Sequence, residues 1–443
     1  MDSNNEIKKA EFKSKGKAWI VSVSMGYGHQ RTAYPLRNLA FGGKIINAND
    51  YEGISDYDKK TWENKQGGYE FISQFKRIPY IGELAFYIFN EYQKIRGFYP
   101  KTDLSKPNFP LKHELDLIRK GFGRNFIATL KGRQGKLPFV TTFFIPAFMA
   151  ETHKYPGEIF CVICDADISR TWAPLEPKKS RIKYFAPTSW VVERLKLYGV
   201  PERNIFFTGY PLPLENIGNQ SMDILKEDLR HRMVNLDPEK KFLKPYHALV
   251  KDYLGDLPKR ADHPLTLMFC VGGAGAQKEL GIRLLNSLSK KIRERKIRII
   301  FSAGIKKNVN DYFLKNIEKM DLNKYLGSSL EVIFSENTES YFEKFNQSLR
   351  KTDILWTKPS ELSFYCALGI PIMVAPTIGY QEEFNKRWLL RIGTGIIQEN
   401  PDFADEWLFD FLNGGRFAES ALEGFINAEK LGTLKIKNII SKI

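Results

Sequence analysis

Two widely separated stretches of this chain share one pattern: a short apolar run, closely spaced glycines, and then residues suited to a helix. The first is residues 19–33, with glycines at 26 and 28; the second is residues 268–276, with glycines at 272, 273 and 275. Glycine permits backbone angles and close approaches that a Cβ atom would prevent. The helix that follows points unpaired N–H groups and a partial positive charge at the loop, which suits an anion or a polar ligand. One such turn is weak evidence, but two predict two Rossmann-like domains that face each other.

Further apolar segments alternate with helical patterns along the chain. In the first half they are residues 137–144, 158–164, 184–186 and 205–207; in the second they are 265–271, 297–302, 330–334, 354–356 and 372–375. Near-continuous apolar runs are typical of parallel strands that are covered on both faces. We therefore predict an α/β fold with a cleft between two domains. The predicted divisions are an N-terminal domain over 1–215, a linker or insertion over 216–262, a C-terminal domain over 263–400, and helices over 401–443 that pack back on the N-terminal domain.

The charge balance indicates an anionic partner. The chain has 67 Lys and Arg against 51 Asp and Glu, a formal net charge of +16. Nucleic acid, anionic lipid headgroups and phosphorylated small molecules all carry the complementary charge, although no nucleic-acid motif accompanies it. The N-terminus lacks the apolar core of a signal peptide, and no apolar run approaches the ~20 residues of a membrane span. We expect a cytoplasmic protein, with peripheral contact at the inner face of the membrane.

Residues 51–110 are crowded with aromatic and basic side chains, most clearly at 71–77 and 86–99. Aromatic rings beside cations suit a membrane interface, where the rings enter the headgroup region and the charges meet anionic lipid. The alternative is a set of ordinary core helices with solvated flanks, and the sequence leaves both open. The four cysteines argue against a disulfide scaffold, and the pair Cys161 and Cys164 lacks the second Cys or His pair of a metal site.

Two candidate catalytic residues follow strands of the first half. His29 lies where the first glycine loop meets its helix, and an imidazole with an ordinary pKa of ~6.5 can take up a proton near neutral pH. Asp165 directly follows the strand 158–164, and the carboxyl ends of parallel strands carry the ligand contacts in open sheets. An aspartate at a strand end is also a common cap, so function and capping both stay open for Asp165.

A second group of polar residues follows strands of the second half. Lys358, Ser360 and Glu361 come at a strand end and helix start, and Gln381, Glu382 and Asn385 come after the next strand. A cation beside a helix N-terminus suits a diphosphate, whereas carboxylate and carboxamide groups suit sugar hydroxyls. With the second glycine loop, these residues predict a nucleotide-sugar pocket.

At these motifs the sequence resembles the GT-B glycosyltransferases of the monogalactosyldiacylglycerol synthase, processive diacylglycerol glucosyltransferase and lipid II synthase (MurG-like) group. The resemblance covers most of the chain, and the order and spacing of its motifs agree. It rests on Gly26-Tyr27-Gly28-His29, residues 162–172, residues 199–211, Gly272-Gly273-Ala274-Gly275, residues 357–371, and Gln381-Glu382 with Asn385.

The resemblance implies a UDP-sugar donor on the C-terminal domain, an acceptor on the N-terminal domain, and inversion at the anomeric carbon. It implies a catalytic base at His29 and an acceptor-side aspartate at Asp165. The donor-binding residues that we predict are Gly272, Gly273, Gly275, Ala276, Lys358, Ser360, Glu361, Gln381, Glu382 and Asn385. The predicted acceptor-binding residues are Gly26, Tyr27, Gly28, Trp172 and Tyr210.

One segment departs from the family pattern. Between Lys358 and Pro371 the chain is slightly shorter, and the glutamate that would bind the ribose aligns with Phe364. Glu361 is the candidate to take over that contact; the nucleotide preference and the retention of activity depend on it. The only D-x-D sequence near a strand end, Asp165-Ala166-Asp167, lies in the wrong half for the donor.

We therefore predict a metal-independent, inverting glycosyltransferase that needs no cofactor. It would move a sugar from a nucleotide sugar, with UDP favoured, to the hydroxyl of a lipid or other acceptor at the membrane surface. Two alternatives stay open: a GT-B nucleotide-sugar epimerase, and a non-catalytic basic protein that binds anionic membrane or nucleic acid.

Overall fold

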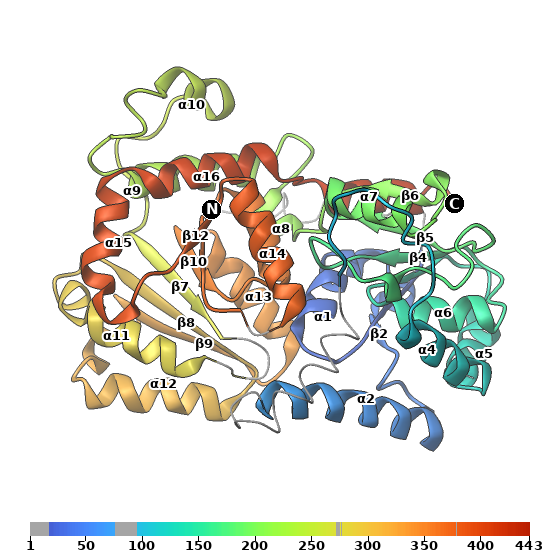
Figure 1. Cartoon of the computed structure of the whole chain (residues 1–443). Coiled ribbons are helices and arrows are strands. Elements are labelled where there is room, and N and C mark those ends of the chain that lie inside the picture. Colours follow the sequence, from blue (N-terminus) through green and yellow to red (C-terminus); the bar gives the residue numbers. More distant parts are fainter. Residues whose placement is uncertain (1–16, 76–94, 272–274, 276, 378) are drawn as a thin grey trace, which may run out of the picture.

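The computed structural model describes residues 17–75, 95–271, 275, 277–377 and 379–443. In these residues two parallel sheets lie side by side, each with its own layers of helices (Figure 1). The predicted α/β fold with two Rossmann-like domains is confirmed. In the aromatic and basic region 51–110, residues 76–94 lie outside the described residues, so the predicted membrane-facing helices there stay a prediction.

The N-terminal sheet has six strands in the order β2-β1-β3-β4-β5-β6, all paired in parallel. These strands are β1 (Trp19–Ser22), β2 (Ile46–Asn47), β3 (Phe139–Thr141), β4 (Ile159–Val162), β5 (Lys183–Ala186) and β6 (Ile205–Phe207). The inner strands are mostly apolar and almost entirely buried because helices cover both faces of the sheet. The helices and 3-10 turns of this half include α1 (Tyr27–Ala33), η2 (Tyr34–Leu39), α2 (Asp56–Phe75), α4 (Phe109–Arg119), α5 (Arg124–Gln134), α6 (Phe144–Thr152), η4 (Arg170–Trp172) and α7 (Ser189–Leu197).

The C-terminal sheet also has six parallel strands, in the order β12-β11-β10-β7-β8-β9. They are β7 (Thr266–Cys270), β8 (Arg298–Gly304), β9 (Leu330–Phe334), β10 (Ile354–Thr357), β11 (Ile372–Val374) and β12 (Gly395–Ile397). Read from the β9 edge, this is the strand order of the Rossmann fold. Around it are α11 (Lys278–Arg293), α12 (Lys307–Lys319), α13 (Thr338–Leu349), η7 (Glu361–Leu368), α14 (Tyr380–Arg391), α15 (Ala404–Asn413) and α16 (Arg416–Asn427).

Both sheets contain a point where the strand order reverses. In the N-terminal sheet it lies between β1 and β3, and in the C-terminal sheet between β7 and β10. Loops that leave the carboxyl ends of two such strands diverge to opposite faces of the sheet and leave a crevice between them, which is where ligands bind in open α/β sheets. Each predicted glycine loop follows one of these strands.

The chain crosses between the two halves twice. After β6 come α8 (Leu214–Ile217), α9 (Asp223–Leu236) and α10 (His247–Leu254), and after α16 comes α17 (Gly432–Ile440). The buried Arg232 of α9 donates to the carbonyl oxygen of Leu368 at 2.8 Å, so α9 packs on the C-terminal half. Ile436 and Ile440 of α17 belong to the apolar cluster of the N-terminal sheet. In the part of the chain that is described, no helix combines the length and apolar character needed to cross a bilayer.

Candidate functional site

His29 lies near the start of α1, directly after the first glycine loop. Its Nδ1 atom is 2.8 Å from the carbonyl oxygen of Thr142, which follows β3 across the reversal point of the sheet. A carbonyl oxygen only accepts, so Nδ1 carries the hydrogen of the neutral ring and Nε2 keeps a lone pair. No group among the described residues hydrogen-bonds Nε2, and the ring packs against Phe143 with centroids 4.6 Å apart. The geometry therefore holds an imidazole with an available basic nitrogen.

The protonation state of His29 is set mainly by burial. Burial lowers its pKa from 6.5 to about 4, and the Thr142 carbonyl opposes that shift only in part. A positive charge at this position is poorly solvated, so the ring is neutral at physiological pH. A neutral imidazole is the form that can accept a proton from a substrate hydroxyl.

Asp165 follows β4 and lies in the same cluster as His29. The thiol of Cys164 joins them, since its Sγ atom is 3.5 Å from His29 Nδ1 and 3.9 Å from Asp165 Oδ2. Burial raises the pKa of Asp165 to about 6; the hydrogen bond from Asn385 opposes this shift, and the negative charges of Glu361 and Glu382 add to it. A carboxyl group with this pKa changes protonation close to neutral pH, which is typical of functional sites. Sequence reasoning considered Cys164 only as half of a C-x-x-C pair and missed this position.

Asn385 of α14 links the two halves at Asp165. Its Nδ2 donates to Asp165 Oδ1 at 3.1 Å and to the carbonyl oxygen of Pro359 at 3.2 Å, while its Oδ1 accepts from the Ala166 N–H at 2.7 Å. The side chain is 1% exposed. Both ends of the amide are therefore used between protein groups, and Asn385 orients the carboxylate of Asp165. A contact of Asn385 with the donor sugar stays a prediction.

Glu361 opens η7 and is held by a cation from the N-terminal half. Arg31 Nε donates to Glu361 Oε1 at 3.2 Å, and the Arg31 side chain is 3% exposed. The Arg31 guanidinium also lies over the ring of Phe345, 4.2 Å from its centroid. Arg31 was not predicted as a site residue because nothing in the local pattern of α1 reveals its distant partner. The predicted ribose contact of Glu361 stays a prediction, and it would compete with this ion pair.

The remaining donor residues lie around the carboxyl ends of β10 and β11. Lys358 Nζ is 2.6 Å from Glu382 Oε1, so the predicted diphosphate cation and the predicted sugar carboxylate form an ion pair. Ser360 precedes η7, and Gln381 lies in the first turn of α14 with a partly exposed side chain. Gly275 has a left-handed φ of 73°. Gly272, Gly273 and Ala276 lie outside the described residues, so the diphosphate contacts of this loop stay predictions.

The predicted acceptor residues take different positions. Tyr27 reaches into the C-terminal half, where its hydroxyl accepts from the Ile305 N–H at 2.9 Å. The Tyr210 ring is 1% exposed and stacks on Phe364, with centroids 4.7 Å apart and planes at 10°. Phe364, at the position of the missing ribose glutamate, is therefore a packing residue between the two halves.

Trp172 and the glycines lie closer to His29. The Trp172 ring is buried, with its centroid 6.4 Å from that of His29. Gly26 is exposed with φ 101°, and a Cβ atom at Gly28 would lie 3.4 Å from Glu361 Oε2. Contact of any of these residues with an acceptor stays a prediction.

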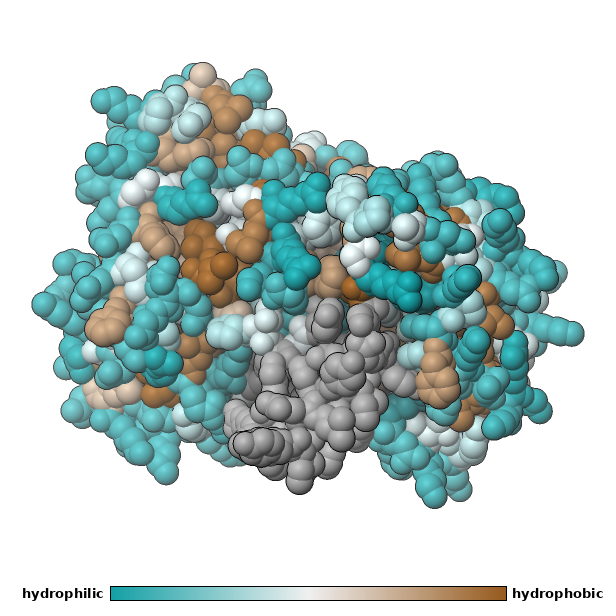
Figure 2. Space-filling model, viewed as in Figure 1, coloured by the Kyte–Doolittle hydropathy of each residue, from teal (hydrophilic) through white to brown (hydrophobic). Residues whose placement is uncertain are grey.

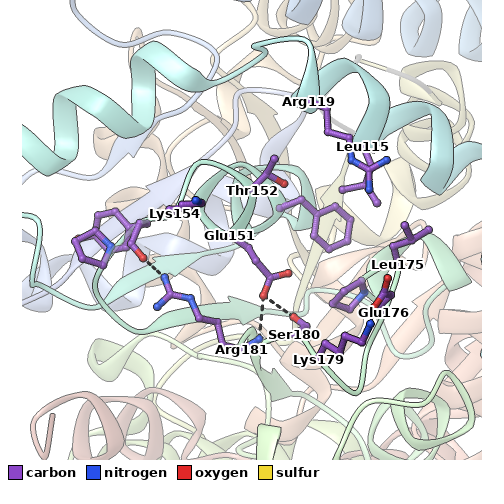
Figure 3. A pocket seen from close by; sticks show the side chains of 14 residues that line it. Leu115, Arg119, Glu151, Thr152, Lys154, Leu175, Glu176, Lys179, Ser180 and Arg181 are labelled. Atoms are coloured by element: carbon purple, nitrogen blue, oxygen red, sulfur yellow. Dashed lines mark hydrogen bonds and ion pairs between the residues drawn. The ribbon is translucent and has the colours of Figure 1, made fainter.

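A cavity of about 540 Å³ lies at the other end of the N-terminal sheet (Figure 3). Its lining includes residues 151, 152, 154–156, 174–176 and 179–181, which precede β4 and β5. Glu151 at its centre accepts from the Ser180 hydroxyl at 2.8 Å and the Arg181 N–H at 2.9 Å. His29 and Asp165 follow the carboxyl ends of strands, so this cavity is separate from the candidate site.

Comparison with known proteins gives one family match and several distant relatives. Residues 257–344 match the family described as "Domain of unknown function (DUF6938)". The chain is 21% identical over 384 residues to the processive diacylglycerol beta-glucosyltransferase of Bacillus licheniformis, a match that covers 85% of this chain and 82% of that protein.

Solved structures of similar fold include MurG and a UDP-GlcNAc 2-epimerase. MurG of Acinetobacter baumannii is 14% identical with a TM-score of 0.46, and the match covers 96% of this chain and 100% of MurG. UDP-GlcNAc 2-epimerase of Neisseria meningitidis, solved with UDP-GlcNAc, is 14% identical with a TM-score of 0.42, covering 77% of this chain and 84% of that one. The fold assignment rests on the strand order of the two sheets. With these sheets and the motifs that border them, the chain resembles the GT-B glycosyltransferases of the monogalactosyldiacylglycerol synthase, processive diacylglycerol glucosyltransferase and lipid II synthase group.

Proposed function

We propose that the protein is an inverting glycosyltransferase that moves a sugar from a UDP-sugar to the hydroxyl group of a lipid at the membrane surface. The observation that carries the proposal is the state of His29: a neutral imidazole whose Nδ1–H is held by Thr142 and whose Nε2 has no partner among the described residues. The name of the Bacillus licheniformis relative supports transfer of a sugar to diacylglycerol. The strand-end position of His29 supports its contact with a ligand.

The proposed reaction is a single displacement. The acceptor oxygen attacks the anomeric carbon while the bond from that carbon to the diphosphate oxygen breaks, and the acceptor proton passes to His29 Nε2. The Thr142 carbonyl then stabilises the imidazolium through Nδ1–H. The departing diphosphate takes the bonding electron pair, and Lys358, released from Glu382, balances part of its charge. Asp165, oriented by Asn385, places a negative charge beside the positive charge that develops on the imidazole.

The test replaces the base and measures transfer and donor binding separately. In His29→Ala we expect turnover to fall by roughly 10²–10⁴-fold, the usual contribution of a general base, with the UDP affinity unchanged. His153→Ala is the matched control, because His153 is also a half-buried histidine bonded to a backbone carbonyl, that of Phe122 at 3.0 Å. Full activity of His29→Ala, measured with a folded protein that binds UDP, would refute the assignment.

A nucleotide-sugar epimerase is the second candidate, favoured by one specific observation. Asp165, Glu361 and Glu382 lie close enough for the two glutamates to raise the pKa of Asp165, and such a reaction needs several acid and base carboxylates around the donor. The assay incubates the protein with a UDP-sugar and no acceptor, and follows the sugar by NMR. A new nucleotide sugar would identify an epimerase, whereas product that forms only with added lipid would identify a transferase.

A further inference from the structure

The helix α10 carries a partly exposed apolar face. It lies on an excursion between α9 and β7 that projects from the C-terminal half of the molecule (Figure 1). The side chains of Tyr246, Leu249 and Tyr253 are 51%, 42% and 37% exposed. Val250 and Leu254 are instead buried against the body of the protein. Three exposed large apolar side chains within eight residues form a patch, unlike the isolated ones that most surfaces carry.

Helix geometry shows that the protein covers only part of this apolar face. With successive residues about 100° apart around the axis, the apolar positions 246, 249, 250, 253 and 254 fall within an arc of about 140°. Val250 and Leu254 occupy one edge of that arc, and the three exposed side chains occupy the rest. The polar residues Lys251 and Asp252 lie on the opposite side of the helix. The arc is therefore a continuous apolar stripe. Within it Tyr246 contacts the ring of Phe242 and Tyr253 that of Phe425, with centroids 4.9 and 6.2 Å apart, yet both tyrosines stay exposed beside Leu249.

The excursion is fixed at both ends, so the exposed face is a stable feature of the surface. Before α10, the buried carboxylate of Asp237 accepts from the N–H groups of Lys241, Phe242 and Leu243 at 2.8, 2.9 and 2.7 Å. After α10, the Arg230 guanidinium donates to the carbonyl oxygen of Asp256 at 3.0 and 2.6 Å. These charged hydrogen bonds fix the chain on both sides of α10.

Basic residues border the stripe. Residues 238–260 contain six lysines and arginines against three acidic residues. Lys240, Lys241 and Lys244 come just before Tyr246 and are exposed. Figure 2 shows hydrophobic side chains gathered on this projection with hydrophilic ones around them. Tyrosine and leucine beside lysine is the combination that enters the headgroup region of an anionic bilayer.

We propose that α10 and the preceding lysines form a docking surface for an anionic lipid bilayer. The inference rests on the proposed function only in that a lipid acceptor gives the surface a purpose; the docking itself does not require catalysis. The lysines favour an anionic lipid over a second copy of this chain, because a symmetric contact through α10 would bring two sets of like charges together. Apolar insertion and attraction to headgroups act together in such binding.

The test is co-sedimentation of the full chain with vesicles of phosphatidylcholine alone, or of equimolar phosphatidylcholine and phosphatidylglycerol. We expect strong binding only to the anionic vesicles. Because each lysine near such a surface contributes about a fivefold factor, the triple substitution Lys240→Gln, Lys241→Gln and Lys244→Gln should weaken binding by roughly a hundredfold at low salt. Leu249→Glu should weaken it by at least tenfold, because it puts a charge into the apolar stripe.

The matched controls lie on α12 in the same half of the molecule. Leu314 is 37% exposed, and Lys315, Lys319 and Lys324 are exposed lysines in or just after that helix. Leu314→Glu and the triple substitution of these lysines by Gln should leave vesicle binding unchanged. Equal loss in both sets of variants would show a diffuse charge effect and would overturn the proposal.

Two further outcomes would also overturn it. One is that the α10 variants bind vesicles as well as the unmodified chain does. The other is that the unmodified chain does not bind vesicles and instead forms a concentration-dependent dimer, which Leu249→Glu dissociates. UDP affinity and transfer to a water-soluble acceptor are measured on the same preparations. If these are absent while vesicle binding follows α10, the proposed transfer reaction fails and the docking surface stands. If UDP affinity and transfer are present but vesicle binding does not depend on α10, the proposed transfer reaction stands and the docking surface fails.

Discussion

Substituting Asp165 by asparagine tests how much the buried negative charge of the candidate site lowers the free energy of unfolding. The amide of Asp165→Asn has nearly the shape of the carboxylate, and its oxygen can still accept the hydrogen bond that Asn385 now donates to Asp165 at 3.1 Å. The substitution removes the negative charge and keeps the contact between the two halves. It therefore isolates the cost of burying that charge beside Glu361 and Glu382.

The magnitude follows from the pKa of Asp165, which burial raises from 3.8 to about 6. At about 1.4 kcal/mol for each pKa unit, the ionised carboxylate lowers the free energy of unfolding by up to about 3 kcal/mol at pH 7. The sign follows from proton uptake. Below pH 6 the folded state takes up a proton before the unfolded state does, so this penalty shrinks as the pH falls and disappears below 3.8. Partial contact of Asp165 with solvent makes about 3 kcal/mol an upper figure.

The assay is urea unfolding of both proteins across this pH range. We expect Asp165→Asn to be more stable than the unmodified protein by about 1–3 kcal/mol near pH 7.5, with the difference vanishing near pH 4. Other titrating groups cancel in the difference. Asp116→Asn is the control, because its side chain is 61% exposed and lies on α4 away from the candidate site. A stability difference that is independent of pH, or a less stable Asp165→Asn at pH 7.5, would refute the reasoning.

Two further predictions concern the same residues. In the proposed transferase, kcat/KM should rise as the pH increases through about 6, where Asp165 ionises. Asp165→Asn should lose this rising limb of the pH profile. His29, whose pKa is about 4, should affect the profile only in more acidic solution. A limb near pH 6 that persists in Asp165→Asn would contradict the role of Asp165. Glu361→Gln should lower the free energy of unfolding by about 3 kcal/mol, because it leaves the buried Arg31 without a counter-charge. The double variant Arg31→Met with Glu361→Leu should recover most of that loss in urea unfolding, and failure to recover it would show that the pair contributes something other than charge balance.

The sequence predicted the local architecture of both halves because local architecture follows from local patterns. Apolar runs of strand length, glycines that precede helices, and polar residues after strands lie within a few positions of each other, and they predicted β1, β7 and β10 together with the loops that leave them. The motif order then identified the resemblance to GT-B glycosyltransferases. His29 and Asp165 could be selected at this level because His29 follows the glycine loop after one predicted parallel strand and Asp165 directly follows another.

The partners of those residues were decided only by tertiary structure. Thr142 is 113 positions from His29, Asn385 is 220 positions from Asp165, and Glu361 is 330 positions from Arg31. No periodicity encodes such pairs, because they form only when β1 comes beside β3 and when the two halves dock. The same is true of α10, whose apolar stripe is visible in the sequence, whereas the part of it that the protein leaves uncovered is not. The sequence by itself determined which chemical groups follow the strands of each sheet; docking of the two sheets determined their partners and, through burial, their charge.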